Sequence, residues 1–287
     1  MPESPEVQAL VEFVAMRTIG HTIREFDVVD FPSYKSRSTS PTTATAARVR
    51  AVRRHGKYVD VELEVADGDG GRASHLVVSF GRHGWLAWYD RMAREPHLPA
   101  EPSSAPAVGR VSFDDDSGFD ITDGGQFRSV GIWIVGNPSD VPAIARLGPD
   151  PIDPGFTREQ FDHPIIGRRK KLKAVLQEQE SFAGIGNAYS DEILFRARLS
   201  PAIHAATLSL DERDGLYDAM IRELREAVDA RRGVPIDQLK AAKVAAMKVH
   251  GRAGEPCPGC AGTIRDFTFS GTSAQYCPEC QTGGTVL

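Results

Sequence analysis

The sequence predicts a multidomain α+β protein, and three observations support this fold class. Short stretches in which apolar and polar residues alternate run from about residue 22 to residue 136, as in an all-β sandwich or barrel. Stretches with helical periodicity follow residue 155, and all four cysteines lie between residues 257 and 280. The Pro- and Gly-rich segment 147–155 is typical of a hinge. We therefore expect domains at 1–146, 147–248 and 249–287.

The same patterns predict the individual elements. Residues 5–18 carry apolar side chains at helical spacing, and Gly20 ends this helix. Strands are expected at 22–31, 58–65, 75–80, 85–90, 109–116, 118–123 and 129–135. Helices are expected at 168–179, 185–199, 209–232 and 235–249. Segments 67–71 and 97–109 have the composition of loops.

Composition indicates an ordinary globular chain, with 41% hydrophobic and 25% charged residues. The net charge of −5 argues mildly against nucleic-acid binding, although a local basic face can still bind a phosphate backbone. No apolar run is long enough to span a membrane, and the first residues lack a secretory signal. We therefore expect a cytoplasmic protein that contacts no membrane.

The cysteines form two Cys-x-x-Cys pairs, Cys257 with Cys260 and Cys277 with Cys280. This spacing is typical of a closed, four-thiolate structural zinc site, and the residues between the pairs have the pattern of a β-hairpin with a Gly turn. The alternative, four unrelated buried thiols, fits the spacing poorly. We expect one structural Zn²⁺.

The first residues, Met1-Pro2-Glu3-Ser4-Pro5-Glu6, permit covalent catalysis. Removal of Met1 is expected before proline, and it would leave Pro2 as a terminal secondary amine beside Glu3. Terminal amines have a pKa of about 7.7–8.0, so a useful fraction is neutral and nucleophilic. Attack on a sugar C1′ would give a cationic iminium, a Schiff-base route. The simpler alternative is that Pro2 only permits processing and Pro5 opens a helix.

Two basic segments are candidates for phosphate contacts. The run from Arg168 to Lys173 is expected to open a helix, although a lone charge run is more often a solvated face. It precedes the segment Ala183–Asn187, a glycine turn whose backbone N–H groups and Asn187 amide are candidates for holding a phosphate. Lys57 follows Gly56 in a turn, which alone is a weak signal.

Taken together, these pieces resemble the bacterial formamidopyrimidine-DNA glycosylase and endonuclease VIII family. The similar segments keep the family's order: PESPE at 2–6, RRHGKY at 53–58, LGPDP at 147–151, LKAVLQEQESFAGIGNAYSDEILFRARLSP at 172–201, and GRAGEPC with the paired CxxC at 251–280. The resemblance implies a two-sheet β-sandwich with flanking helices, a helix-two-turn-helix domain and a zinc-finger β-hairpin.

The resemblance also implies an activity and its residues. The chain would be a bifunctional DNA glycosylase and abasic-site lyase that excises oxidised bases in base excision repair. Pro2 would be the nucleophile, Glu3 would protonate the sugar ring oxygen, and Glu6 would support the charge of the pocket. Lys57 would contact a phosphate and assist β-elimination. Asn187 and Lys173 would bind the DNA backbone, and the damaged nucleotide would be flipped out of the stack.

Several positions depart from the family pattern. Arg82 stands where a methionine fills the void left by the flipped base, and Phe127 survives as an aromatic wedge without the arginines that precede it in the family. Thr272 replaces an arginine that promotes δ-elimination, so this step would be weak, absent or assisted by Arg265. The segment between Arg232 and Gly251 is short, which favours oxidised pyrimidines.

Two other functions stay open at this point. One alternative is a family member that binds damaged DNA with lost or altered chemistry. It would fit Arg82 in place of the methionine, Thr272 in place of the arginine, and the negative net charge of the chain. A zinc-ribbon interaction protein would leave the turn before Asn187 unexplained. The favoured hypothesis is a monomeric bacterial glycosylase in the nucleoid, with damaged DNA as its partner.

Overall fold

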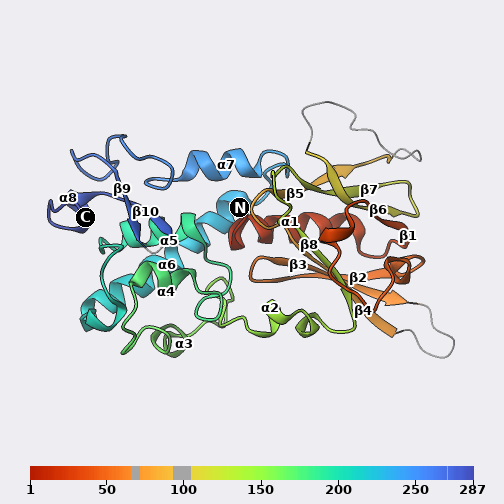
Figure 1. Ribbon diagram of the computed structural model, residues 1–287, viewed down its shortest axis with the longest axis horizontal. Helices are drawn as coiled ribbons and strands as arrows, with labels where there is room; N and C mark the ends of the chain where they lie inside the picture. Colours follow the sequence, from red (N-terminus) through yellow and green to blue (C-terminus); the bar gives the residue numbers. More distant parts are fainter. Residues whose placement is uncertain (66–71, 93–104, 270) are drawn as a thin grey trace. The chain divides into compact units, whose positions relative to one another are not determined.

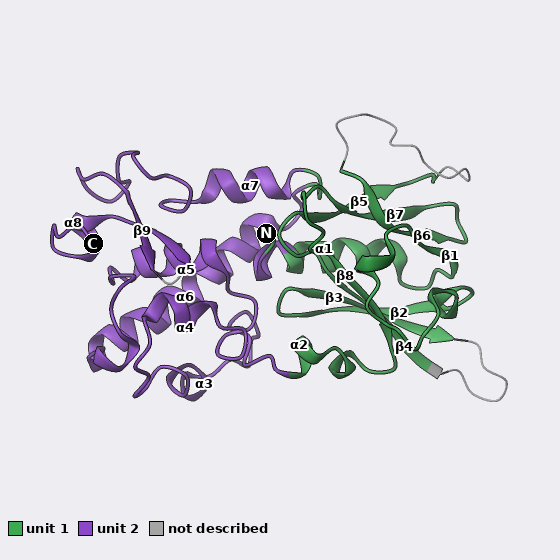
Figure 2. Ribbon diagram, viewed as in Figure 1, with its two compact units in different colours: residues 1–2, 7–145, 235–237 green, residues 3–6, 146–234, 238–287 purple. Residues whose placement is uncertain are grey.

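The computed structural model describes residues 1–65, 72–92, 105–269 and 271–287 (Figure 1). The expected turn cluster at 67–71, and residues 97–104 of the expected loop, fall outside these ranges. Contacts divide the chain into two compact units (Figure 2). Unit 1 contains residues 1–2, 7–145 and 235–237, and unit 2 contains residues 3–6, 146–234 and 238–287. The helices that follow residue 146 and the cysteine-bearing segment thus share unit 2. The three expected domain boundaries stay a prediction.

Unit 1 contains two four-stranded antiparallel sheets (Figure 1). The first has the order β1 (Ile23–Val28), β6 (Ala107–Phe113), β7 (Gly118–Asp123) and β5 (Gly84–Tyr89). The second has the order β2 (Arg48–His55), β3 (Tyr58–Val65), β4 (Arg72–Ser79) and β8 (Gly131–Val135). A Cβ built on Gly109 of β6 would lie 2.9 Å from Cδ1 of Ile132 on β8, so the two sheets face each other closely. The predicted sandwich is confirmed.

Strand β2 is absent from the sequence expectations. Its segment, RVRAVRRH, is rich in arginine, so its apolar content is low. Val49 and Val52 nevertheless point into the core, while Arg48, Arg50 and Arg53 lie on the exposed face. Strict alternation would place two residues three positions apart on opposite faces, and the irregular pairing between Val49 and Ala51 is what turns both valines inward. Because arginines dominate the segment, its two inward valines are too few to give a strand pattern in the sequence.

Shorter elements complete unit 1. Helix α1 (Ser4–Thr18) buries Val7, Leu10, Val11 and Val14, as its periodicity predicts, and its first turn is assigned by contacts to unit 2. Short helical turns are η1 (Phe31–Ser33), η2 (Pro41–Ala44), η3 (Pro138–Asp140) and α2 (Pro142–Ala145).

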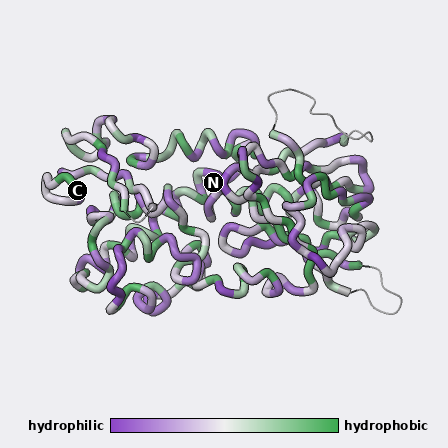
Figure 3. Tube along the Cα trace, viewed as in Figure 1, coloured by the Kyte–Doolittle hydropathy of each residue, from purple (hydrophilic) through white to green (hydrophobic). Residues whose placement is uncertain are grey.

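Unit 2 is mainly helical. It contains α3 (Arg158–Asp162), α4 (Leu172–Gln177), α5 (Asn187–Arg196), η4 (Ala205–Thr207), α6 (Leu210–Arg231), α7 (Leu239–Ala246), α8 (Pro278–Gln281) and the hairpin β9 (Arg265–Phe269) and β10 (Thr272–Tyr276). Its core includes the fully buried Phe182, Tyr189 and Leu216. Hydrophobic and hydrophilic stretches alternate along the Cα trace (Figure 3). None of the described helices is long and apolar enough to cross a membrane.

Helix α4 begins later than its sequence predicts. The basic run is expected to open the helix, but Arg168–Lys170 precede it and Lys171 is its extended N-cap. Positive charge is unfavourable at the positive end of a helix dipole, which accounts for the late start. The first three cations of the run therefore lie on a loop, whereas Lys173 lies in the first turn of α4.

Candidate active site and metal centre

The carboxylate of Glu3 lies at the N-terminus of α5. Its Oε1 accepts a hydrogen bond from the backbone nitrogen of Ala188 at 3.0 Å. Its Oε2 accepts from the nitrogens of Gly186, in a short contact, and Tyr189, at 3.4 Å. Only 2% of Glu3 is exposed. Helix N-termini favour anions because their first N–H groups lack partners within the helix, so this position fixes Glu3 as a carboxylate.

This arrangement corrects one expectation. The sequence suggests that the glycine turn before α5 offers its N–H groups to a phosphate, but three of the N–H groups around it donate to Glu3. The Asn187 side chain is half-buried, and its Oδ1 accepts from Nε2 of Gln177 at 2.8 Å. No hydrogen bond from the Asn187 amide nitrogen to another described residue is present.

Glu6 lies one helical turn after Glu3 and is equally buried. Its Oε2 accepts from the backbone nitrogen of Glu3 at 3.1 Å, and its Oε1 accepts from the Tyr189 hydroxyl at 2.8 Å. Arg231 approaches the same oxygen with Nε at 3.4 Å, while Nη2 of Arg231 is buried without a partner among the described residues. Burial, followed by the charge of Glu6, raises the pKa of Tyr189, so its hydroxyl remains a donor. Glu6 therefore holds the start of α1 in place.

The close approach of Gly186 to Glu3 gives a first testable prediction. A Cβ at position 186 would lie 2.5 Å from Cδ of Glu3, closer than real Cβ contacts allow. Gly186→Ala should displace the carboxylate and reduce base excision, while the fold persists. Excision by this variant is to be compared with Gly215→Ala, in α6, where an added Cβ meets no atom within 4 Å. Gly215→Ala should stabilise the helix by about 0.5–1 kcal/mol; equal activity of the two variants would contradict the role of Gly186.

Pro2 and Lys57 belong to unit 1. Pro2 is buried and precedes Glu3 in the chain. Lys57 lies in the two-residue turn between β2 and β3, where Gly56 has a φ of 55°, a conformation that suits glycine.

Behind this turn lies the buried Asp60, which accepts hydrogen bonds from His55 at 3.0 Å and His75 at 2.9 Å. Burial alone would raise the pKa of Asp60, but these two hydrogen bonds outweigh it and lower the pKa. Asp60 therefore stays ionised and braces the strands on either side of the turn that carries Lys57.

The structure brings the turns of Arg82 and Phe127 together within unit 1. The backbone nitrogen of Arg82 donates to Oγ of Ser129 at 2.9 Å. Buried Asp123 organises the second turn by accepting from the backbone nitrogens of Ser129, at 2.7 Å, and Val130, at 3.1 Å. Arg82 is exposed and the Phe127 side chain is 82% exposed. Both candidate wedge residues thus project from adjoining, internally braced turns.

Lys173 lies elsewhere than expected. Its side chain is fully buried, and Nζ donates to Asp191 Oδ1 at 2.5 Å, Ser190 Oγ at 3.1 Å and the Asn187 carbonyl at 3.2 Å. Burial lowers the pKa of Lys173, against the opposing charge of Asp191. The predicted DNA contact of Lys173 is therefore corrected: this lysine has no surface to offer a phosphate, and it instead supports the first turn of α5 from inside.

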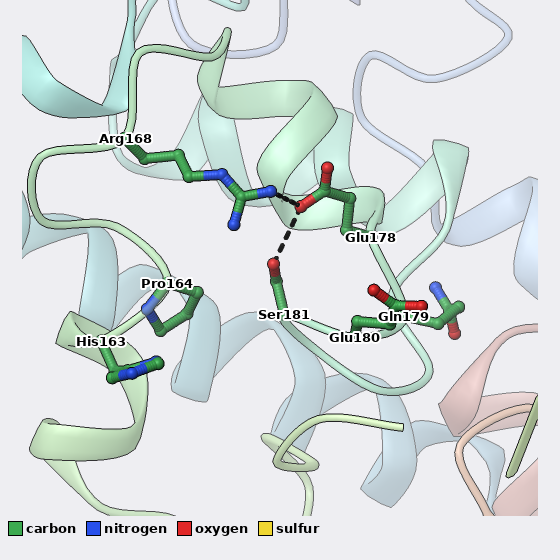
Figure 4. A pocket seen from close by; sticks show the side chains of 7 residues that line it. All are labelled: His163, Pro164, Arg168, Glu178, Gln179, Glu180 and Ser181. Carbon is green, nitrogen blue, oxygen red and sulfur yellow. Dashed lines mark hydrogen bonds and ion pairs between the residues drawn. The ribbon is translucent and has the colours of Figure 1, made fainter. Parts of the chain in front are cut away.

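The remaining basic run is partly neutralised. Arg168 and Lys170 both pair with Glu178. Arg168, Glu178 and Ser181 line a cavity of about 560 Å³ (Figure 4). Lys171 instead points to the C-terminal hairpin, with Nζ 4.2 Å from the ring centroid of Phe269. The run is therefore a loop in which Arg168 and Lys170 share one acid, while Arg168, Arg169 and Lys170 all remain exposed.

The four cysteines converge. Their sulfur atoms all lie within 4.8 Å of one another, with 3.9 Å between Cys257 and Cys280 and 3.4 Å between Cys260 and Cys277. A tetrahedral ion with metal–sulfur bonds of about 2.3 Å requires sulfur separations of about 3.8 Å. Backbone N–H groups at Gly259 and Gly262 donate to two of the sulfurs, as expected for thiolates. The donor set fits one four-coordinate metal ion.

The expected hairpin lies between the two Cys pairs. Thr272 pairs with Phe269 beside the turn at Gly271, while Arg265 pairs with Tyr276 at the other end. The two positions are therefore separated by the length of one strand, a distance of about 13 Å. Arg265 is exposed, but Lys171 is the cation that contacts the end of the hairpin where Thr272 lies.

Comparisons with known proteins agree with this architecture. The model of the formamidopyrimidine-DNA glycosylase N-terminal domain matches residues 1–130, and that of the formamidopyrimidine-DNA glycosylase H2TH domain matches residues 147–237. A formamidopyrimidine-DNA glycosylase from Heliobacterium modesticaldum is 33% identical over 98% of this chain and 100% of its own length. The chain belongs to the formamidopyrimidine-DNA glycosylase family. Its enzyme class is that of the DNA glycosylases of base excision repair, which also have lyase activity at abasic sites.

Solved structures of this family share the fold. The crystal structure of MutM (Fpg) from Thermus thermophilus is 28% identical, with a TM-score of 0.78 over 99% of this chain and 100% of that chain. The Lactococcus lactis Fpg in complex with abasic-site DNA is 22% identical, with a TM-score of 0.80 over 98% and 99% of the two chains. The second likeness concerns the fold alone.

Three residues of the site are not expected from the sequence: Tyr189, Arg231 and Lys243. Nζ of Lys243 lies 3.1 Å from both Glu3 Oε1 and Glu6 Oε2. Tyr189 lies inside a segment that resembles the family, so its position just after the glycine turn could have marked it as a site residue. Arg231 lies 225 positions from Glu6 along the chain and Lys243 lies farther still, and no local pattern marks either of them.

Proposed function

We propose that this chain is a bifunctional DNA glycosylase and abasic-site lyase that acts through a Schiff base between Pro2 and the deoxyribose C1′ of a damaged nucleotide. The observation that supports it most strongly is the Glu3 carboxylate, fixed by three backbone N–H groups directly after Pro2 in the chain. A helix N-terminus can hold an acid for structural reasons alone, but here the acid directly follows the residue whose terminal nitrogen is the proposed nucleophile. A flipped nucleotide would be the substrate, because C1′ is inaccessible inside a duplex.

The proposed chemistry moves one proton through Glu3. The neutral imino nitrogen of Pro2 attacks C1′, and the bond between C1′ and the base breaks, with the electron pair leaving on the base. The nitrogen, now cationic, gives its proton to the Glu3 carboxylate, which passes it to the ring oxygen O4′. The C1′–O4′ bond then breaks and the nitrogen lone pair forms the iminium. Glu3 thus acts first as base and then as acid.

Other residues supply contacts to the DNA. Lys57, in the β2–β3 turn, and the Asn187 amide are the proposed phosphate contacts, which position a duplex without reading its sequence. Phe127 and Arg82 are the candidates for filling the space that the extruded base leaves. Because such contacts release counterions, DNA affinity should fall with added salt.

The metal of the four-cysteine site is proposed to be one structural zinc ion, held by Cys257, Cys260, Cys277 and Cys280. When bound, it would fix the hairpin that carries Arg265 and Thr272. With threonine at position 272, we expect weak δ-elimination after β-elimination. Arg265 and Lys171 are two cations of this hairpin region that can assist it.

Oxidised pyrimidines are the proposed substrates, since the short segment between Arg232 and Gly251 leaves little chain to cover a purine. We further propose that the enzyme acts as a monomer on chromosomal DNA in the bacterial cytoplasm. A panel of duplexes with single oxidised purines or pyrimidines, with the product ends resolved, tests the preference. Faster excision of oxidised purines would contradict it.

Borohydride trapping tests the proposed chemistry. Reduction of the protein with abasic-site DNA should give a covalent adduct that peptide mapping places on residue 2. Pro2→Gly leaves a primary amine, so it should trap less and excise more slowly. A version with an uncleaved N-terminal tag is the matched control and should form no adduct there. If the native terminus does not trap while another glycosylase does, the proposal is wrong.

A further inference from the structure

Lys243 joins the two acids of the site through one nitrogen. Its Nζ lies 3.1 Å from Oε1 of Glu3 and 3.1 Å from Oε2 of Glu6, and 4.9 Å from the ring centroid of Tyr189. Its side chain is 12% exposed, whereas both acids are nearly inaccessible. All four residues belong to unit 2, so the cluster lies within a single compact body.

Charge balance explains what Lys243 contributes. Two buried carboxylates that touch the same nitrogen repel each other, because little water lies between them to screen their charges. Arg231 compensates one charge by approaching Glu6, and Lys243 compensates the second. Tyr189 stays neutral.

The charge of Lys243 is itself secured by this arrangement. Burial would lower the pKa of Lys243, but the charges of Glu3 and Glu6 outweigh it and raise the pKa, so the ammonium persists. The nearby Lys173 is paired with Asp191, so it is already committed to another acid.

The rest of α7 has little core to hold it in place. Leu239 is the buried residue of this helix, and Val244 is 70% exposed. The hydrophobic character of α7 is visible along its trace (Figure 3), and most of its alanine and valine side chains are exposed. A helix that buries so little, and directs its lysine at two acids, is better explained by the charge it delivers than by packing.

We propose that Lys243 is a positioning residue for base excision, which keeps the Glu3 carboxylate ionised and fixed so that it can accept the proton released by the Pro2 nitrogen. This inference rests on the proposed function. Without Lys243, the acid pair would take up a proton more readily, and Glu3 could no longer act as the base.

The test compares Lys243→Met and Lys243→Arg with Lys240→Met, an exposed control on the same helix. Single-turnover excision is measured across pH, together with DNA affinity. Lys243→Met should slow excision about tenfold near neutral pH, with the acid limb of the profile moved up by about one pH unit or more. Lys243→Arg should return the acid limb of the profile to its position in the parent. Lys240→Met should match the parent in both excision rate and pH profile. An unmoved limb in Lys243→Met, or an arginine variant that behaves like it, would overturn the inference.

A second measurement separates this inference from the proposed function. The melting temperature of Lys243→Met is compared with that of the parent from about pH 8 to about pH 3. The parent should melt higher near neutral pH, and the difference should vanish near the acid end, where carboxylates are protonated. A difference independent of pH would overturn the charge pairing. If the pairing holds but the parent traps no abasic DNA, the proposed function fails alone.

Discussion

Glu3→Gln is expected to slow base excision by about 10²–10⁴-fold, the usual effect of removing a general acid–base group. An amide can neither accept the proton of the Pro2 nitrogen nor donate one to the ring oxygen. The loss should appear in single-turnover excision, while affinity for undamaged duplex changes little because Glu3 contacts no phosphate in the proposed arrangement.

The same substitution should also lower stability. Both oxygens of Glu3 accept N–H donors, so the amide NH₂ of glutamine would place a donor against other donors. An unsatisfied buried group costs about 1–3 kcal/mol, which urea unfolding can measure. Glu180→Gln is the matched control, because the Glu180 side chain is 70% exposed and pairs with Arg146 on the surface. A Glu3→Gln enzyme as active as the Glu180 variant would remove Glu3 from the mechanism.

Removal of the metal should unfold the C-terminal segment and abolish tight DNA binding. Among the described residues of this segment, the buried hydrophobic side chains are few: Val249, Cys257, Ile264, Ala274, Tyr276 and Cys277. Structural zinc contributes about 10–16 kcal/mol of apparent binding free energy in small domains, which exceeds what so few side chains supply. We expect one zinc per chain by elemental analysis.

Chelation and mutation test this expectation together. A strong chelator, or Cys277→Ser, should release the metal, expose the hairpin to proteolysis and lower DNA affinity. Zinc added back should restore the chelated protein. Thr268→Ser, on the exposed face of β9, is the control and should retain metal and binding. A metal-free protein that keeps its hairpin protected would show that the thiols alone hold the fold.

Local patterns predict much of the fold. Seven strands of the sandwich, the long helices and the hairpin follow from periodicity, because residues close in sequence decide those elements. The convergence of the four cysteines follows from their spacing for the same reason. Strand β2 escapes prediction because its pairing is irregular after Val49, so its two inward valines lie three residues apart and do not alternate with the arginines. Helix α4 starts later than predicted, because its run of cations suits a loop better than a first helical turn.

The site depends on contacts that no local pattern encodes. Pro2 and Glu3 are identified from chemistry and family resemblance, but the binding of Glu3 to the first turn of α5 joins residues 183 to 186 positions apart. Lys173 looks available for a phosphate because a basic run is usually solvated, and only tertiary packing shows that its partner is Asp191. Lys243 lies in a segment whose only visible property is its shortness.

Residues 3–6 belong by contacts to a unit whose other members begin at Arg146. During synthesis this tetrapeptide leaves the ribosome long before Gly186, Arg231 and Lys243 exist to receive it. Closing so long a loop is slow, and a growing chain folds its early segments first. The sheets can therefore form while the acids are still solvated, and the reactive centre is completed only near the end of translation, when the hairpin region is also being made.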